Sequence, residues 1–113
     1  MSIAMQVVNG VMFIQVPGRH LDASNAESFK AMAIPDLTGK ASVVLDLADV
    51  EFIDSSGLGI LLACLRHLQG AGGDLRLCGL TPQVQMLFEL VRMQRVFQIY
   101  KTREQAALSF EER

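Results

Sequence analysis

Two adjacent serine hydroxyls, Ser55 and Ser56, occupy the position in this sequence that most favours chemistry. They lie within residues 52–60, FIDSSGLGI, where an apolar strand gives way to a helix that contains glycine. A helix that begins here directs its first unpaired backbone N–H groups and the positive end of its dipole toward the hydroxyls. Such a position accommodates an anion, so the pattern predicts that one of the serines carries a phosphate.

The same residues also have a purely structural explanation. One serine could do no more than cap the helix, which is worth about 1 kcal/mol, although capping does not require both serines. Gly57 and Gly59 could simply bring the helix close to the sheet. Each glycine costs up to about 1 kcal/mol in a helix interior relative to alanine, which favours a first turn kept open for a partner to approach. Both explanations remain open on local chemistry alone.

The elements around the serines are predicted to hold them firmly. Residues 41–47 are predicted to form a strand whose middle residues, Val43, Val44 and Leu45, are all apolar, which is typical of a strand covered on both faces of a parallel or mixed sheet. A helix is then predicted from near Ser56 to Gln69, ending at the glycine-rich residues 70–73. The serines therefore lie between a buried strand and a helix.

This helix is apolar on more than one side. Its leucines form the expected core stripe, which comprises Leu58, Leu61, Leu62, Leu65 and Leu68. Ile60 and Cys64 lie on a flank beside Gly57 and are apolar too. That flank is either a surface for a partner or a second packed face.

The remaining elements alternate between strands and helices. Residues 3–8 and 11–16 predict a hairpin, because Asn9-Gly10 readily supplies the positive φ angles of a two-residue turn. Further strands are predicted over residues 74–78 and 96–100. The alternation predicts an α/β fold, a single domain over residues 1–113, with a mixed sheet of four to five strands opened by the hairpin and about four helices packed on it.

Three further helices have recognisable start signals. Asp22 or Ser24 is a candidate cap for the first helix. Thr81, followed by proline, starts a helix after the strand over residues 74–78. Thr102 with Gln105 three positions later has the spacing of a capping box and opens the final helix.

The composition excludes several classes of function. The sequence has 113 residues, of which 50% are hydrophobic, enough to bury a core. Its formal net charge is -2, from ten basic and twelve acidic residues that form no basic patch, so we expect no nucleic-acid binding. The N-terminus lacks a secretion signal and no apolar run is long enough to cross a bilayer. A cytoplasmic protein without membrane insertion is therefore expected.

The cysteines and histidines do not form a recognisable metal or redox site. Cys64 and Cys78 lie among aliphatic residues without CxxC spacing, so two buried free thiols are expected. His20 and His67 are far apart and are not accompanied by cysteines. We predict no metal and no cofactor.

Residues 52–59, with Asp46-Leu47 before them, resemble the signature of bacterial anti-anti-sigma factors of the STAS domain family. The resemblance extends across almost the whole chain. Counterparts exist for four further family features: the opening hairpin, the Gly-x-Leu-Asp turn, the Gly-Gly before a strand and the Thr-Pro helix start. These counterparts are Asn9-Gly10, Gly18 to Asp22, Gly72-Gly73 and Thr81-Pro82. The resemblance implies a STAS fold and a binding protein without catalytic activity of its own.

The resemblance also implies a role for the serine that directly follows the aspartate, which is Ser55. In the family this serine is phosphorylated by an anti-sigma factor that is itself a serine kinase. The unphosphorylated form binds the kinase and frees a sigma factor, and a phosphatase of the PP2C type restores that form. The partner-binding residues expected on this basis are Asp22, Asp54, Ser56, Gly57, Leu58, Gly59 and Ile60.

One turn departs from the family pattern. The family usually has a single residue between the glycine and the Leu-Asp pair, whereas this chain has Arg19 and His20 there. The turn that carries Asp22 therefore differs in length. His20 is either a loop residue without a role or a contact for the phosphate or the partner.

Two other functions remain as alternatives. STAS domains also serve as scaffolds that are not phosphorylated, or as accessory subunits of membrane transport systems. An enzyme would need Ser55 or Ser56 as nucleophile, with His67 or His20 as base. The serines lack the Gly-x-Ser-x-Gly arrangement of a nucleophile elbow, which favours a binding protein over an enzyme.

Overall fold

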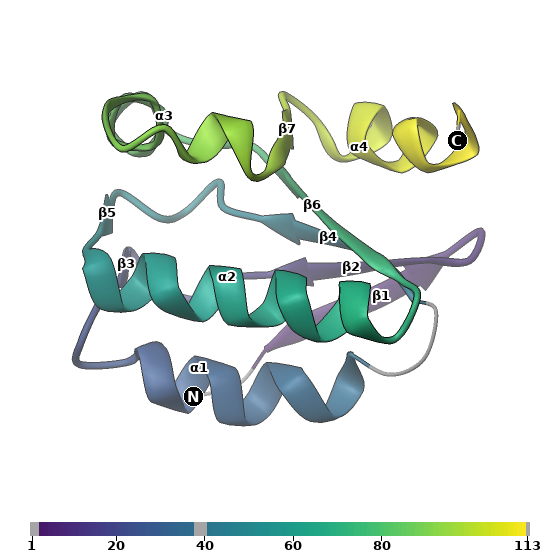
Figure 1. Cartoon of the computed structure of the whole chain (residues 1–113), viewed down its shortest axis with the longest axis horizontal. Helices are drawn as coiled ribbons and strands as arrows, with labels where there is room; N and C mark the ends of the chain where they lie inside the picture. Colours follow the sequence, from purple (N-terminus) through teal and green to yellow (C-terminus); the bar gives the residue numbers. More distant parts are fainter. Residues whose placement is uncertain (1–2, 38–40, 113) are drawn as a thin grey trace.

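The computed structural model describes residues 3–37 and 41–112 and contains a five-stranded mixed sheet (Figure 1). The strands lie in the order β1-β2-β4-β6-β7; β1 and β2 are antiparallel, and the pairs β2–β4, β4–β6 and β6–β7 are parallel. Their bounds are β1 Ala4–Val8, β2 Val11–Gln15, β4 Ser42–Asp46, β6 Asp74–Cys78 and β7 Gln98–Tyr100. The predicted α/β fold and mixed sheet are confirmed.

The N-terminal hairpin forms where the sequence predicts it. Asn9 has a φ of 51° and Gly10 a φ of 81°, the positive values that a two-residue turn between twisted strands requires. The turn places Val8 opposite Val11. β1 is thereby an edge strand of the sheet, and β2 is the strand at which the parallel part begins.

Helices cover both faces of the sheet (Figure 1). Their bounds are α1 Ala26–Ala33, α2 Ser55–Gly70, α3 Pro82–Leu90 and α4 Arg103–Ser109, with 3-10 turns η1 Ile34–Asp36, η2 Met93–Arg95 and η3 Phe110–Glu112. α1, α2 and the buried side of α3 contribute to the larger core on one face. α4 and η3 cover the other face.

The central strand β4 shows why the sheet needs cover on both sides. Val43 and Leu45 point into the larger core, whereas Val44 between them points into the smaller core with Ala106 and Phe110. All three β4 side chains are fully buried. A continuous apolar run is therefore required here, because successive side chains of a strand point to opposite faces.

The first helix begins later than either predicted cap. α1 starts at Ala26, and its N-cap residue is Asn25, whose side chain does not cap it. The carboxylate of Asp22 accepts instead from the backbone N–H of Ser24, at 2.9 Å. The prediction that Asp22 or Ser24 caps this helix is wrong, because the two residues form a local turn with each other.

The other helix starts agree with the sequence. Thr81 Oγ1 accepts from the N–H of Val84 at 3.4 Å, and Thr102 Oγ1 accepts from the N–H of Gln105 at 3.1 Å. The last strand is shorter than the predicted span of residues 96–100. The 3-10 turn η2 precedes it, and the buried ring of Phe97 packs beside that of Phe88 instead of joining the strand.

Both cysteines are free and buried, as predicted. Burial raises the pKa of the Cys64 thiol to about 11. Burial, with the nearby carboxylate of Asp46, raises the pKa of Cys78 to about 12. Both thiols stay protonated near neutral pH, and a protonated thiol is a poor nucleophile.

Candidate functional site

A small two-stranded sheet positions residues 52–60, which we call the serine segment. β3 (His20–Leu21) and β5 (Phe52–Ile53) pair in parallel, so the Gly18–Asp22 turn lies beside the residues that lead to Ser55. The Arg19 carbonyl accepts from the N–H of Glu51 at 2.7 Å, and the Leu21 carbonyl accepts from the N–H of Asp54 at 3.4 Å. The turn and the serine segment are thereby joined by backbone hydrogen bonds.

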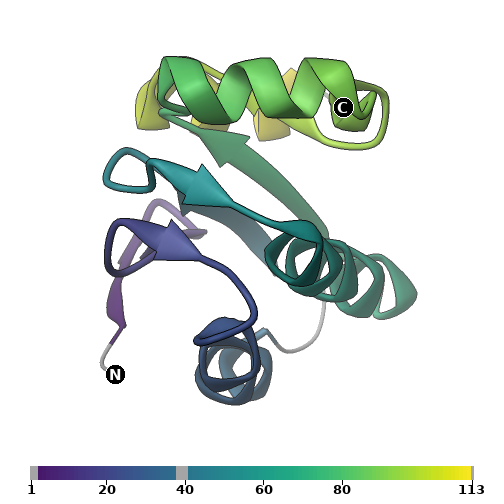
Figure 2. The ribbon, with the colours of Figure 1, turned by 90° about the vertical axis from the view of Figure 1, so that its left-hand side faces the viewer.

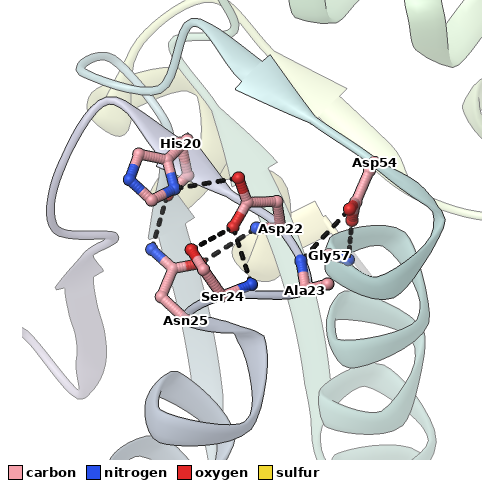
Figure 3. A network of polar contacts seen from close by, with 7 residues as sticks. All are labelled: His20, Asp22, Ala23, Ser24, Asn25, Asp54 and Gly57. Carbon is pink, nitrogen blue, oxygen red and sulfur yellow. Dashed lines mark hydrogen bonds and ion pairs between the residues drawn. The ribbon is translucent and has the colours of Figure 1, made fainter.

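Asp54, and not a serine, caps α2 (Figure 3). Its Oδ1 accepts from the N–H of Gly57 at 3.0 Å, and its Oδ2 accepts from the N–H of Ala23 at 3.1 Å. The first bond satisfies an N–H that has no partner within the helix, and the second joins the start of α2 to the loop before α1. The alternative in which a serine caps this helix is therefore wrong.

The cap leaves the two hydroxyls accessible. α2 begins at Ser55, one residue earlier than predicted, and Ser55 and Ser56 are its first two residues. Both are exposed. Within the described part of the chain, neither hydroxyl takes part in a hydrogen bond. Neither serine is needed to hold the fold, and both can be reached from solvent.

The two glycines of the segment differ from each other. A Cβ on Gly57 would lie 2.0 Å from the carbonyl oxygen of Leu21 and 2.9 Å from Cγ2 of Ile53, so this glycine lets α2 pack against β3 and β5. For Gly57 the structural explanation is correct, and the expectation of an open turn is wrong. A Cβ on Gly59 would meet no atom within 4 Å, and this residue is exposed. Gly59 thus belongs to the open surface.

The apolar residues of the segment lie mostly inward. Ile60 is 7% exposed and lies in the larger core with Cys64, so the flank beside Gly57 is a second packed face. Leu58 is half-buried and packs against the same core. Among the residues expected to bind a partner, Gly57 and Ile60 offer no open surface, whereas Leu58 offers part of its side chain.

Asp22 lies at the centre of a polar network (Figure 3). Its Oδ1 accepts from the hydroxyl of Ser24 at 2.6 Å, and its Oδ2 is 3.2 Å from Nδ1 of His20. Asn25 closes the turn by accepting from the Asp22 N–H at 2.9 Å and donating to the His20 carbonyl at 2.8 Å. The pKa of Asp22 lies below its ordinary value. The hydrogen bond from the Ser24 hydroxyl is the largest cause, and the backbone N–H of Ser24 and the nearby His20 lower it further, so the carboxylate is ionised at neutral pH.

The turn that carries Asp22 is linked to the start of α2, because the N–H of Ala23, the residue after Asp22, donates to the carboxylate of Asp54. His20 lies in β3, where its Nδ1 is 3.2 Å from Oδ2 of Asp22, and a contact of His20 with phosphate or partner stays a prediction. Sequence reasoning assigned no part in this network to Asn25, and considered Ser24 for capping alone. The spacing Asp22-x-Ser24 is an Asx-turn signal that could have identified the serine.

The geometry separates the serines from one of the two candidate bases of the enzymatic alternative, His67. Ser56 and His67 lie in the first and last turns of α2, about 16 Å apart along its axis. Among residues 3–37 and 41–112, no group of three or more His, Cys, Asp or Glu side chains could hold a metal ion. In that same part of the chain, no helix is both long and apolar enough to span a membrane.

Comparison with known proteins identifies the family. Residues 2–106 match the STAS domain model. The chain belongs to the STAS domain family. It is 32% identical over 111 residues to BtrV of Bordetella bronchiseptica, which is named as an anti-sigma factor antagonist, and the match covers 97% of this chain and 95% of BtrV. It is 26% identical over 100 residues to the anti-sigma-B factor antagonist of Bacillus subtilis, covering 88% of this STAS domain and 92% of that protein.

Solved structures extend the comparison to three dimensions. An anti-sigma factor antagonist from Thermotoga maritima has a TM-score of 0.86 and 28% identity, with 95% of this STAS domain and 92% of that chain covered. The phosphorylated form of SpoIIAA from Bacillus has a TM-score of 0.69 and 21% identity, covering 96% and 99%. The murine anion transporter Slc26a9 has a TM-score of 0.77 and 22% identity, covering 96% of this chain and 19% of the transporter. At these two lower identities the likeness shows the fold alone.

Proposed function

We propose that this STAS domain is an anti-sigma factor antagonist whose binding is controlled by phosphorylation of Ser55. The observation that carries the proposal is the exposed Ser55 hydroxyl at the first position of α2, directly after the aspartate that caps the helix. The relatives named as anti-sigma factor antagonists support the same role. Over residues 1–113 the chain would act as one binding domain.

A phosphate on Ser55 is compatible with the fold. The residue lies where the backbone N–H groups of α2 have no intrahelical partner and where the helix dipole favours negative charge. Phosphorylation should therefore leave the domain folded and change its surface. We infer that the switch acts on partner binding and not on folding.

The charge that phosphorylation adds falls in an acidic neighbourhood. A phosphoserine carries about -1.5 to -2 charges at neutral pH, directly beside Asp54 and near the loop that holds ionised Asp22. A partner that covers this surface must remove water from all of these charges. Since 1.4 kcal/mol changes an affinity about tenfold, repulsion and desolvation of a few kcal/mol would release the partner.

The proposed cycle has two partners and takes place in the cytoplasm. An anti-sigma factor with serine-kinase activity binds the unphosphorylated domain, releases its sigma factor and phosphorylates Ser55. A PP2C-type phosphatase removes the phosphate. The partner surface would include Asp22, Asp54, Ser56, Gly59 and the exposed part of Leu58.

Phosphate transfer tests this function directly. The domain is incubated with ATP and each purified serine-kinase anti-sigma factor of its source organism, and intact-mass and peptide mass spectrometry locate the product. One phosphate on wild type and on Ser56→Ala, with none on Ser55→Ala, is expected. Ser56→Ala is the matched control, because both serines are exposed in the first turn of α2. No phosphate on Ser55 with any of these kinases would contradict the proposal and favour a scaffold or transport-subunit role.

A further inference from the structure

Large apolar side chains are exposed on α3 and β5. Met86 and Leu90 are 69% and 79% exposed and lie four residues apart, on one side of α3. Val84 and Phe88, each two residues earlier, are buried in the larger core, which directs Met86 and Leu90 outward. Phe52 of β5 is 56% exposed. We call Phe52, Met86 and Leu90 the α3–β5 surface.

This surface lies at the same end of the molecule as Ser55. α3 packs beside β5, and β5 is followed directly by Asp54 and Ser55. The hydroxyl of Thr81, the α3 cap, donates to the carbonyl of Val50 at 2.9 Å, two residues before Phe52. Figure 1 shows α3, β5 and the first turn of α2 together at the left, and Figure 2 shows all three facing the viewer.

The exposed residues around Ser55 cannot by themselves form a complete interface. A stable contact buries about 800 Å² on each partner, and most of its binding energy comes from a few large apolar or aromatic side chains near the centre. In the first turns of α2, Gly57 and Ile60 are buried and Leu58 is half-buried. A partner over Ser55 must find its apolar anchors on neighbouring elements, and the α3–β5 surface supplies them.

We propose that the serine kinase that phosphorylates Ser55 docks on the α3–β5 surface. The inference rests on the proposed function. The charges also suit such a partner, because the carboxylates of Asp22 and Asp54 lie near Ser55, and the active site of a kinase presents cations to phosphate groups. In this arrangement the kinase active site faces Ser55, Asp22 and Asp54. An apolar surface of the kinase beside that active site covers Met86 and Leu90.

The test uses the purified kinase for which wild type becomes phosphorylated on Ser55. The double variant Met86→Gln/Leu90→Gln keeps side-chain size and helix propensity while removing the apolar anchors. Its Kd for the kinase, measured by calorimetry without ATP, should rise at least tenfold. In steady-state phosphorylation the KM should rise similarly, with kcat within about twofold, because the reacting hydroxyl is unchanged.

Leu108→Gln is the matched control, because Leu108 is 56% exposed on α4, a different helix. It should bind and be phosphorylated like wild type. An unchanged Kd for the double variant, with Ser55 still phosphorylated, would overturn the docking inference and leave the proposed function intact. If Ser55 accepts no phosphate from any of the kinases, both proposals fail. Sedimentation tests a second copy of the chain as the occupant. If wild type self-associates and the double variant does not, while both bind the kinase with the same affinity, the surface belongs to a second copy and the inference is overturned.

Discussion

The start of α2 and the contact beneath α4 are both held by charged side chains, but they differ in what surrounds the charge. At the start of α2, Asp54 is partly exposed and accepts from two backbone N–H groups. Beneath α4, Arg76 is 5% exposed, donates to the hydroxyl of Ser109 and stacks 4.3 Å from the centre of the Phe110 ring. The first arrangement keeps charge at the surface, where a partner can meet it. The second uses charge to attach a helix to the sheet.

The two regions also use their serines differently. Ser109 is buried; it accepts from Arg76 and donates to the carbonyl of Ala106. Ser55 is exposed and follows an aspartate that already caps the helix. The comparison indicates that a serine needed for packing and a serine available for modification can be told apart by burial and hydrogen bonds, although both lie at helix ends.

The largest effect is expected for Gly57→Ala at the start of α2. The new Cβ would lie 2.0 Å from the backbone carbonyl oxygen of Leu21, which cannot move without separating β3 from α2. The free energy of unfolding should fall by about 3 kcal/mol or more, measured by urea denaturation. Gly59→Ala is the control, and it should raise stability by about 0.5–1 kcal/mol, because its Cβ would meet no atom within 4 Å. Equal effects of the two variants would contradict the close approach at Gly57.

Ser109→Ala should have the next largest effect and directly tests the contact beneath α4. Removing the hydroxyl leaves a buried N–H of Arg76 without its acceptor, and Nε of Arg76 is already without a hydrogen-bond partner within residues 3–37 and 41–112. The free energy of unfolding should fall by about 1–3 kcal/mol. Ser55→Ala and Ser56→Ala should change it by less than about 0.5 kcal/mol. A similar loss for all three serines would remove the distinction between the two regions.

Ser55→Asp should weaken binding of the kinase without ATP by about tenfold, which corresponds to about 1.4 kcal/mol. The carboxylate places part of the charge of a phosphate beside Asp54. Ser55→Ala should bind like wild type and should not be released when ATP is added. Calorimetry measures both affinities, and equal values for wild type, alanine and aspartate would show that charge at this position is not the switch.

Asp54→Ala should lower the free energy of unfolding by about 1 kcal/mol, since it removes the cap of α2. It also removes the acceptor for the N–H of Ala23. Asp54→Asn should retain most of the stability, because asparagine caps helices as well as aspartate does. Thermal denaturation of the three proteins separates the cap from the charge, and an alanine variant as stable as wild type would exclude a capping role.

The smallest effect is expected from the titration of Asp22. Because its folded-state pKa lies below the ordinary value of 3.8, its contribution to stability is present above about pH 4 and is lost as pH falls through the folded pKa. Ser24→Ala should raise that pKa, since the Ser24 hydroxyl is the largest cause of the shift. Carboxyl NMR titration measures both values. The same pKa in the two proteins would contradict this cause.

Local signals in the sequence were sufficient for much of the fold. Asn9-Gly10 made the hairpin predictable, Thr81 and Thr102 marked helix starts, and the apolar run of β4 indicated a strand covered on both faces. These features depend on residues within a few positions of one another, so propensity and pattern are informative. The position of the serines at a strand-to-helix junction was predictable for the same reason, and the structure adds that both are exposed.

The tertiary structure decided which residues hold that serine in place. Asp54 reaches an N–H 31 positions earlier in the chain, at Ala23, and Gly57 packs against the carbonyl of Leu21. Both contacts exist because β3 and β5 pair in parallel, and no local pattern encodes that pairing. The sequence by itself therefore determined that a hydroxyl stands at the start of a helix. The packing of distant segments determined that an aspartate caps the helix, that Gly57 serves close approach, and that Ser55 is left exposed to solvent.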